Sequence, residues 1–338
     1  MLTSSLEHVS EIYSTKFFFW GFMGRLNFDK IIKKVKWVGA LCFAFAPFSV
    51  DANIGDGPRA YLPPPVNSTI VTVYGMGMGA EYESYSMAQN KNIDAYLAVA
   101  QLTQTVDLFG YYAALTAILP YAQTQLNIPL GQRNLKRQAN GLSDIQLLFT
   151  LGLYNLPPLS MSEYSDYQPG FALGALARLT LPTGEYDSSN LVNISENRYA
   201  MQLGIIASYT LGSSLLDPRL MTLDLLPSIT LYSNNRDFYG MTKTQKQSYQ
   251  LEAHVTKNIK AWLWGSLDGI YSYRGSGEII DVNQIDAKGV MSFGVTLGVN
   301  LLESFGLKAS YGRSFELNQG NQVDSYFWRV SLTYININ

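Results

Sequence analysis

The sequence predicts an all-β protein, a closed antiparallel transmembrane barrel of about twelve strands in a Gram-negative outer membrane. First, 47% of the residues are hydrophobic and only 15% are charged, whereas soluble domains carry about a quarter charged residues. Second, no run of roughly 20 apolar residues could form a spanning helix; the longest apolar stretch, residues 37–50, contains a proline. Third, stretches of alternating apolar and polar residues recur from Ser68 onward, with the period of β-strands.

The N-terminal region is ordered like a secretory signal peptide. Lysines cluster in residues 30–36, apolar residues fill 37–50, and Ala52 supplies the small residue before a cleavage site. The sequence therefore predicts that residues 1–52 are removed when the chain is exported to the outer membrane. Residues before Met23 add nothing to this signal, so Met23 is an alternative start.

The composition argues against several classes of function. The net charge is −2 at pH 7, and removing the leader leaves the chain acidic, so no nucleic-acid partner is expected. The single cysteine, Cys42, lies in the leader behind Leu41, where a lipoprotein signal needs a small residue. The exported chain therefore lacks a thiol for a disulfide or a thiolate metal site. One histidine remains, His254, and neither a metal nor a cofactor is predicted.

The exported chain divides into a short segment and a barrel. Residues 53–67 are rich in glycine and proline, which predicts an irregular periplasmic segment or a plug, and residues 68–338 form the barrel. An open sheet edge in lipid would leave backbone groups unpaired at several kcal/mol each, so the sheet must close. The predicted strands are residues 68–79, 92–104, 110–125, 141–154, 168–182, 198–212, 220–235, 247–257, 260–274, 287–301, 304–316 and 323–335.

The connections between these strands alternate in length. Residues 107–110 form a short connection and residues 127–141 a long one, and this order continues along the chain, as it does for the periplasmic turns and outer loops of barrels. One connection breaks the order, because residues 155–167 are long where a short turn is expected. Aromatic residues gather near the strand ends, as the girdles at the two membrane interfaces require.

The strand face opposite the apolar face should line the lumen. This face carries charges of both signs, so a strongly ion-selective pore is not expected. Mixed charges with indole rings favour a narrow path for small, partly apolar molecules, because twelve strands leave a smaller lumen than the 16–18 of porins. Alternatively, the charges pair across the lumen and only fill the barrel. The lumen-lining candidates are Asp144, Arg178, Asp224, Glu252, His254, Trp262, Trp264, Asp268, Lys308 and Arg329.

Two other functions stay open beside a passive channel. A structural or adhesive barrel would act through its outer loops, and a sealed lumen would favour it. A barrel hydrolase would use a serine activated by a base, and only His254 could supply an imidazole. Because the sequence places no serine beside it, no enzyme is predicted.

Residues 178–200 hold acids, amides and arginines around a Pro-Thr-Gly turn. A phosphate-binding loop would need a helix behind it, and a strand follows instead. Proline cannot donate to the ladder, and glycine tolerates positive φ, so an outer loop at the barrel mouth is predicted. We expect Asp187, Asn193 and Arg198 to tie this loop to the mouth by hydrogen bonds or an ion pair.

Three stretches resemble one family: "GPRAYLPPPVNSTIVTVYG" (residues 57–75), "GLSDIQLLFTLGLYN" (141–155) and "LPTGEYDSSNLVNISENRYAMQLGIIASY" (181–209). The family is labelled as the putative meta-pathway of phenol degradation and consists of transporter-like outer-membrane barrels. Its most specific residues here are Pro182, Thr183, Gly184, Tyr186, Asp187, Leu191, Asn193, Asn197 and Arg198.

The resemblance covers nearly the whole exported chain. It implies a barrel that lies in outer-membrane lipid and allows passive uptake of small hydrophobic or aromatic molecules. Two features depart from the family pattern. The chain ends "LTYININ" rather than on an aromatic residue, and acidic Glu185 follows the Pro-Thr-Gly turn.

Overall fold

The computed structural model describes residues 55–82, 91–130, 133–190, 193–238, 240–279, 283–285, 287–302, 304–317 and 323–337. The predicted leader, residues 1–52, and the alternative start at Met23 lie outside these residues, as do Asn53 and Leu191.

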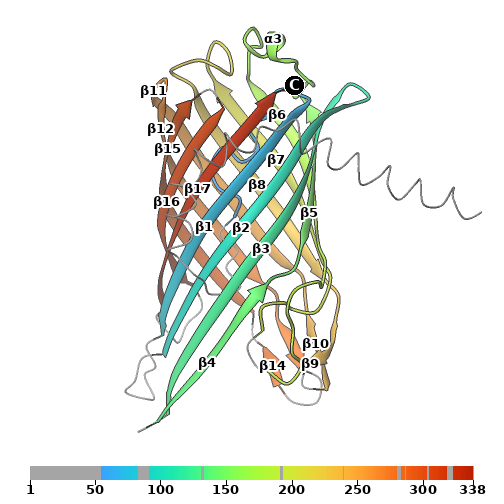
Figure 1. Ribbon diagram of the computed structural model, residues 1–338, viewed down its shortest axis with the longest axis vertical. Helices are drawn as coiled ribbons and strands as arrows, with labels where there is room; N and C mark the ends of the chain where they lie inside the picture. Colours follow the sequence, from blue (N-terminus) through green and yellow to red (C-terminus); the bar gives the residue numbers. More distant parts are fainter. Residues whose placement is uncertain are drawn as a thin grey trace, which may run out of the picture. The chain divides into compact units, whose positions relative to one another are not determined.

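The described chain folds into a closed antiparallel barrel (Figure 1). Each strand pairs with its neighbour in the sequence, and the first and last strands close the ring from Ser68 opposite Ile337 to Tyr82 opposite Val323. The ring has twelve strand positions, which confirms the predicted fold class. Its strands are β1 (Ser68–Tyr82), β2 (Lys91–Leu108), β3 (Tyr111–Leu130), β5 (Gln146–Tyr154), β6 (Phe171–Thr180), β7 (Ala200–Leu211), β8 (Met221–Tyr232), β11 (Ser248–Lys260), β12 (Leu263–Arg274), β15 (Lys288–Leu302), β16 (Phe305–Glu316) and β17 (Val323–Ile337).

One ring position is divided between two strands. β4 (Arg133–Leu142) and β5 both pair with β3, one after the other, and residues 143–145 separate them. The sequence predicts a loop over residues 127–141, but β3 and β4 pair along this stretch. The difference arises because strand pairing satisfies the backbone of this polar stretch, so it needs no apolar face to form.

The two ends of the barrel differ. The turn end holds the start of β1, the end of β17 and the short connections; the long connection 155–170 also lies there and contains α3 (Met161–Tyr164). The loop end carries a second, four-stranded sheet (Figure 1). Its strands are β9 (Asn235–Phe238), β10 (Met241–Gln245), β13 (Gly277–Ile279) and β14 (Asn283–Ile285).

Burial alternates along the barrel strands. On β11, Leu251 is 42% exposed on the outer face, whereas the neighbouring Glu252 and His254 are buried. This is the arrangement of a barrel whose outer surface meets lipid and whose interior is polar. No helix in the described part of the chain is long and apolar enough to cross a membrane.

One side of the interior is nonetheless apolar. A band of buried aliphatic side chains crosses neighbouring strands from β2 to β8, and Tyr61 and Tyr74 pack against it. We call this set the apolar band; its members are Val99, Ile118, Leu148, Leu176, Ile206 and Leu226. The interior therefore has an apolar side and, around β11 and β12, a polar side.

Candidate functional site

The described part of the N-terminal segment, residues 55–67, lies inside the barrel and contacts strands from different parts of the ring. The carboxylate of Asp56 accepts hydrogen bonds from Nη2 of Arg178 on β6 at 2.5 and 2.6 Å. The guanidinium of Arg329 on β17 donates to the backbone carbonyls of Gly55 (2.8 Å) and Asp56 (2.9 Å). Two predicted lumen candidates therefore hold this segment.

A third candidate, Glu252, binds the backbone of the segment. Its Oε2 accepts a hydrogen bond from the amide of Asp56 at 3.0 Å, and its Oε1 accepts one from Gln250 at 2.9 Å. Gly55 has a φ of +68°, and a Cβ at this position would collide with the Glu252 carboxylate. Glycine is required here because other residues rarely adopt positive φ.

Arg59 fastens the segment to the polar side of the barrel. Its Nε donates to Oγ1 of Thr256 at 2.9 Å, and its Nη2 donates to Oδ1 of Asn258 at 2.8 Å. The guanidinium also lies 4.5 Å from the ring centre of Trp264. Lys308 contacts the segment more weakly, since its Nζ lies 3.4 Å from the carbonyl oxygen of Pro58.

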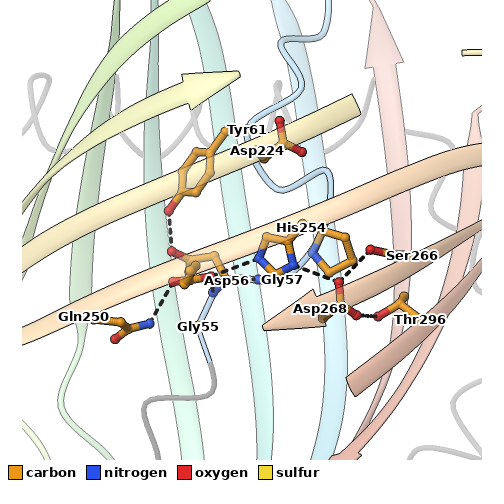
Figure 2. A network of polar contacts seen from close by, with 12 residues as sticks. Gly55, Asp56, Gly57, Tyr61, Asp224, Gln250, His254, Ser266, Asp268 and Thr296 are labelled. Carbon is orange, nitrogen blue, oxygen red and sulfur yellow. Dashed lines mark hydrogen bonds and ion pairs between the residues drawn. The ribbon is translucent and has the colours of Figure 1, made fainter. Parts of the chain in front are cut away.

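The charge of Asp56 is stabilised at this position. Burial alone would raise the pKa of the Asp56 carboxyl, but Arg178, the hydroxyl of Tyr61 and Arg329 outweigh burial and lower this pKa below 3.8. Tyr61 donates a hydrogen bond to Asp56 and packs on the apolar band (Figure 2). The segment thus makes charged contacts with β6, β11 and β17 and places an aromatic ring against the apolar band.

His254 lies between two carboxylates (Figure 2). Its Nδ1 is 2.8 Å from Oδ1 of Asp268, and its Nε2 is 3.3 Å from Oε2 of Glu252. Asp268 also accepts hydrogen bonds from Ser266 and Thr296, each at 2.6 Å. Within the described residues, the hydrogen-bond partners of the imidazole are these two carboxylates.

The remaining lumen candidates occupy different environments. Asp224 accepts hydrogen bonds from Ser208 and from Thr222 on the polar side of the barrel, and Trp264 is buried under Arg59. Trp262 was expected to line the lumen. Instead it lies in the turn between β11 and β12 and is half exposed. Strand alternation cannot be extended into a turn, because the backbone there no longer follows a period of two.

Asp144 is buried and anchors a loop at the break between β4 and β5. Its carboxylate accepts hydrogen bonds from the amide of Gly184 (2.9 Å), the hydroxyl of Ser195 (2.6 Å) and the amide of Glu196 (3.2 Å). A Cβ on Gly184 would come within 2.7 Å of the Ser143 carbonyl carbon. Two of the stretches that carry the family resemblance therefore meet here.

The mouth loop, residues 181–199, is tied mainly to the neighbouring loops. The Tyr186 hydroxyl donates to the carbonyl of Asp237 at 2.8 Å and accepts a hydrogen bond from Asn235 at 2.9 Å. Asn197 lies 3.4 Å from the Asn235 side chain. Thr183, next to Pro182, accepts a hydrogen bond from the amide of Ile145 at 3.0 Å.

Of the three residues expected to tie this loop, only Arg198 reaches another element. Arg198 is buried, pairs with Glu196, donates to Oε1 of Gln245 on β10 at 2.6 Å, and lies 4.3 Å from the ring centre of Tyr232. Asp187 and Asn193 instead bond within the loop: Asp187 accepts from Ser189 and Asn190, and Asn193 bonds to the backbone of Asp187. Their expected role at the mouth was wrong, because Asp and Asn side chains readily bond their own turn.

A cavity of about 250 Å³ lies beside the N-terminal segment, between residues 56–64 and the inner faces of the strands around β1. Sequence reasoning missed the residues of the segment that shape this region, chiefly Asp56, Arg59 and Tyr61. One feature of the sequence could have pointed to them: Arg59 and Tyr61 lie in residues 57–75, the first stretch that resembles the family.

Comparisons with known proteins agree with the architecture. A model of the family described as "Putative MetA-pathway of phenol degradation" matches residues 78–329. The COG4313 outer membrane channel from Pseudomonas putida F1 shares 20% sequence identity, over 83% of this chain and 99% of that chain, with a TM-score of 0.67. The transport unit of the autotransporter AIDA-I from Escherichia coli shares 8% identity over 78% and 89% of the two chains, with a TM-score of 0.46. No curated protein matches the chain in sequence.

Proposed function

Because this chain belongs to the family described as "Putative MetA-pathway of phenol degradation", we propose that it is a passive outer-membrane channel for small hydrophobic or aromatic molecules. The similar COG4313 protein is a channel by its name. In this proposal the exported chain lies in outer-membrane lipid, catalyses no reaction and needs no cofactor.

The observation that carries the proposal is the apolar band inside the barrel. An interior that only had to be filled could be lined with paired polar side chains, as it is around His254 and Asp268. Instead, buried aliphatic side chains cross strands β2 to β8 on one side. Burying such a side chain stabilises by about 1.5–3 kcal/mol, and the same surface offers a favourable environment to an apolar solute.

The N-terminal segment determines how this channel opens. The segment lies in the barrel and is held by Arg178, Glu252 and Arg329, so solutes pass beside it or after it shifts. The band and the cavity lie beside the segment, since Tyr61 packs on the band and residues 59–64 line the cavity. We therefore assign the segment the role of a plug and the band the role of the solute path.

The alternative is a closed barrel that acts through its outer loops. The position of the segment in the lumen favours it, and so does the second sheet at the loop end, which is tied together by Tyr186, Asn235 and Arg198.

Swelling of liposomes that contain the purified full chain separates the two functions. The solutes are 4-hydroxybenzyl alcohol and, as a polar comparison of similar size, arabinose. We expect faster swelling than in empty liposomes, more so for the aromatic solute, and a further increase in a variant that lacks residues 53–65. If neither form admits either solute faster than empty liposomes, the channel is wrong and the closed barrel is supported.

A further inference from the structure

We propose that the cavity beside the N-terminal segment is a binding site for a small aromatic carboxylate, whose anionic group is held by Lys308 and Ser331. This inference deepens the proposed function, on which it rests, by naming the chemical class of the solute. It starts from two side chains inside the barrel: Ser331, whose hydroxyl has no partner among the described residues, and Lys308, which makes one long contact with the segment.

Ser331 on β17 has a buried hydroxyl whose hydrogen-bonding capacity is not used by any described residue. Ser331 is 4% exposed, lines the cavity, and its hydroxyl has no hydrogen-bond partner among the described residues. Four threonine hydroxyls of the cavity are paired, since Thr72 bonds Thr333 at 3.0 Å and Thr103 bonds Thr116 at 2.7 Å. A buried hydroxyl without a partner is unfavourable by about 1–3 kcal/mol, so it indicates a group that belongs there.

The second step is the position of Lys308. Lys308 on β16 stands directly opposite Ser331 on β17, and Ser331 stands opposite Tyr74 on β1. Side chains in directly opposite positions of an antiparallel pair are neighbours, with Cβ atoms about 5 Å apart. An ammonium, a hydroxyl and a phenol ring therefore lie in one row across three strands, all lining the cavity.

The third step is the charge of the cavity. Its charged lining residues among those described are Asp56, Arg59, Lys308 and Arg329. Asp56 is neutralised by Arg178, while Arg59 and Arg329 are engaged with Thr256, Asn258 and backbone carbonyls. Among the described residues, Lys308 has one hydrogen-bond contact, a long one of 3.4 Å to the Pro58 carbonyl oxygen. The ammonium has three donors, so this cation is the one best placed to bind an anion.

The fourth step is the apolar end of the same row. Tyr74 packs against the apolar band, and Tyr112, Leu148 and Ile206 also line the cavity. A ligand with its anionic group at Lys308 and Ser331 would lay its body against these side chains. Aromatic rings pack favourably against one another. A cavity of about 250 Å³ lies below the usual range of drug-sized pockets, which restricts the ligand to about one ring.

The test is calorimetric titration of the full chain in detergent with benzoate, benzyl alcohol and hexanoate. We expect benzoate to bind at least tenfold more tightly than the other two. In Lys308→Met, which keeps the length of the side chain and removes its charge, benzoate binding should weaken about tenfold or more, while benzyl alcohol should change by less than twofold. Ser331→Ala should weaken benzoate binding severalfold.

Lys260→Met is the matched control, because Lys260 lies at the end of β11 beside the exposed Trp262 and should leave benzoate binding unchanged. Heat-modifiable migration on gels verifies that each variant forms the barrel. Equal affinity for benzoate and benzyl alcohol, equal affinity for benzoate and hexanoate, or unchanged benzoate binding in Lys308→Met would each overturn the assignment.

The two proposals fail separately. Benzoate binding without any solute flux into liposomes rejects the channel and leaves the site. Flux of neutral solutes without benzoate binding rejects the site and leaves the channel.

Discussion

Asp56 and Arg178 form an ion pair between the N-terminal segment and β6, with Nη2–oxygen distances of 2.5 and 2.6 Å. Both side chains are largely shielded from solvent, with 19% and 13% exposure. This pair links a segment without regular structure to a rigid wall of the barrel. Substitutions at this pair therefore give the most direct test of whether the segment plugs the barrel.

Asp56→Asn should loosen the segment. The substitution keeps the shape of the side chain and leaves Arg178 without its carboxylate, and removing one partner of a shielded pair destabilises by a few kcal/mol. We expect more frequent openings in planar-bilayer recordings. Arg178→Met should act alike, and the double variant should add little beyond either single change. Asp237→Asn, at an exposed position of β9 in the second sheet, serves as the control; additive effects of the first two variants would contradict the pairing.

Acid should weaken the contacts that hold the N-terminal segment in the lumen, and the channel should then open more often. The pKa of Asp56 is lowered below 3.8 in the folded chain, so the charged form is favoured by the contacts of the segment. A lowered pKa contributes stability that is fully present above 3.8 and is lost as the pH falls through the lowered value. Openings should therefore be constant from pH 7 to about pH 5 and rise below about pH 4. The part of this rise that comes from Asp56 should be absent in Asp56→Asn; identical profiles would show that other carboxylates cause it.

Asp144→Ala should release the mouth loop. The change removes hydrogen bonds from Gly184, Ser195 and Glu196, and bonds to a charged group contribute about 1.5–3 kcal/mol each. We expect proteinase cleavage within residues 181–199 to accelerate at least tenfold, since about 1.4 kcal/mol corresponds to that factor. Asp166→Ala, on the exposed connection at the turn end, should leave this cleavage unchanged.

Arg198→Ala should separate the mouth loop from the second sheet. Arg198 is buried and joins Glu196, Gln245 and the ring of Tyr232. Its removal should speed proteolysis of both the mouth loop and residues 233–247, and should alter solute flux through the mouth. Unchanged proteolysis and unchanged flux together would show that Arg198 does not hold the loop.

His254→Asn should lower the stability of the barrel, and we expect no ester hydrolysis by either the unmodified chain or this variant. The imidazole separates the carboxylates of Glu252 and Asp268, and losing hydrogen bonds to charged groups should reduce the free energy of unfolding by about 1–3 kcal/mol. The measurement is the temperature at which the folded band disappears on gels. Hydrolysis of a lipid or peptide ester by the purified chain, abolished in His254→Asn, would instead establish an enzyme.

Much of the barrel could be predicted from the sequence, because the period of two is local and strongly imposed. Lipid outside and polar groups inside force alternation on every crossing strand, so the strands around residues 248–302 are visible without any tertiary information. The need to pair every backbone group in lipid then implies closure. The same alternation placed Glu252 and His254 on the inward face, where the structure has them buried.

Only the tertiary structure shows which side chains contact one another inside the barrel and at its mouth. The pairing of Asp56 with Arg178 joins positions 122 residues apart, and no periodicity connects a glycine- and proline-rich segment to a strand. Asp144 stands at the break between β4 and β5, where it binds the mouth loop, and Trp262 stands in a turn. The row from Lys308 through Ser331 to Tyr74 depends on strand register. Local sequence determines which face a side chain takes, whereas register and chain path determine which side chains become neighbours.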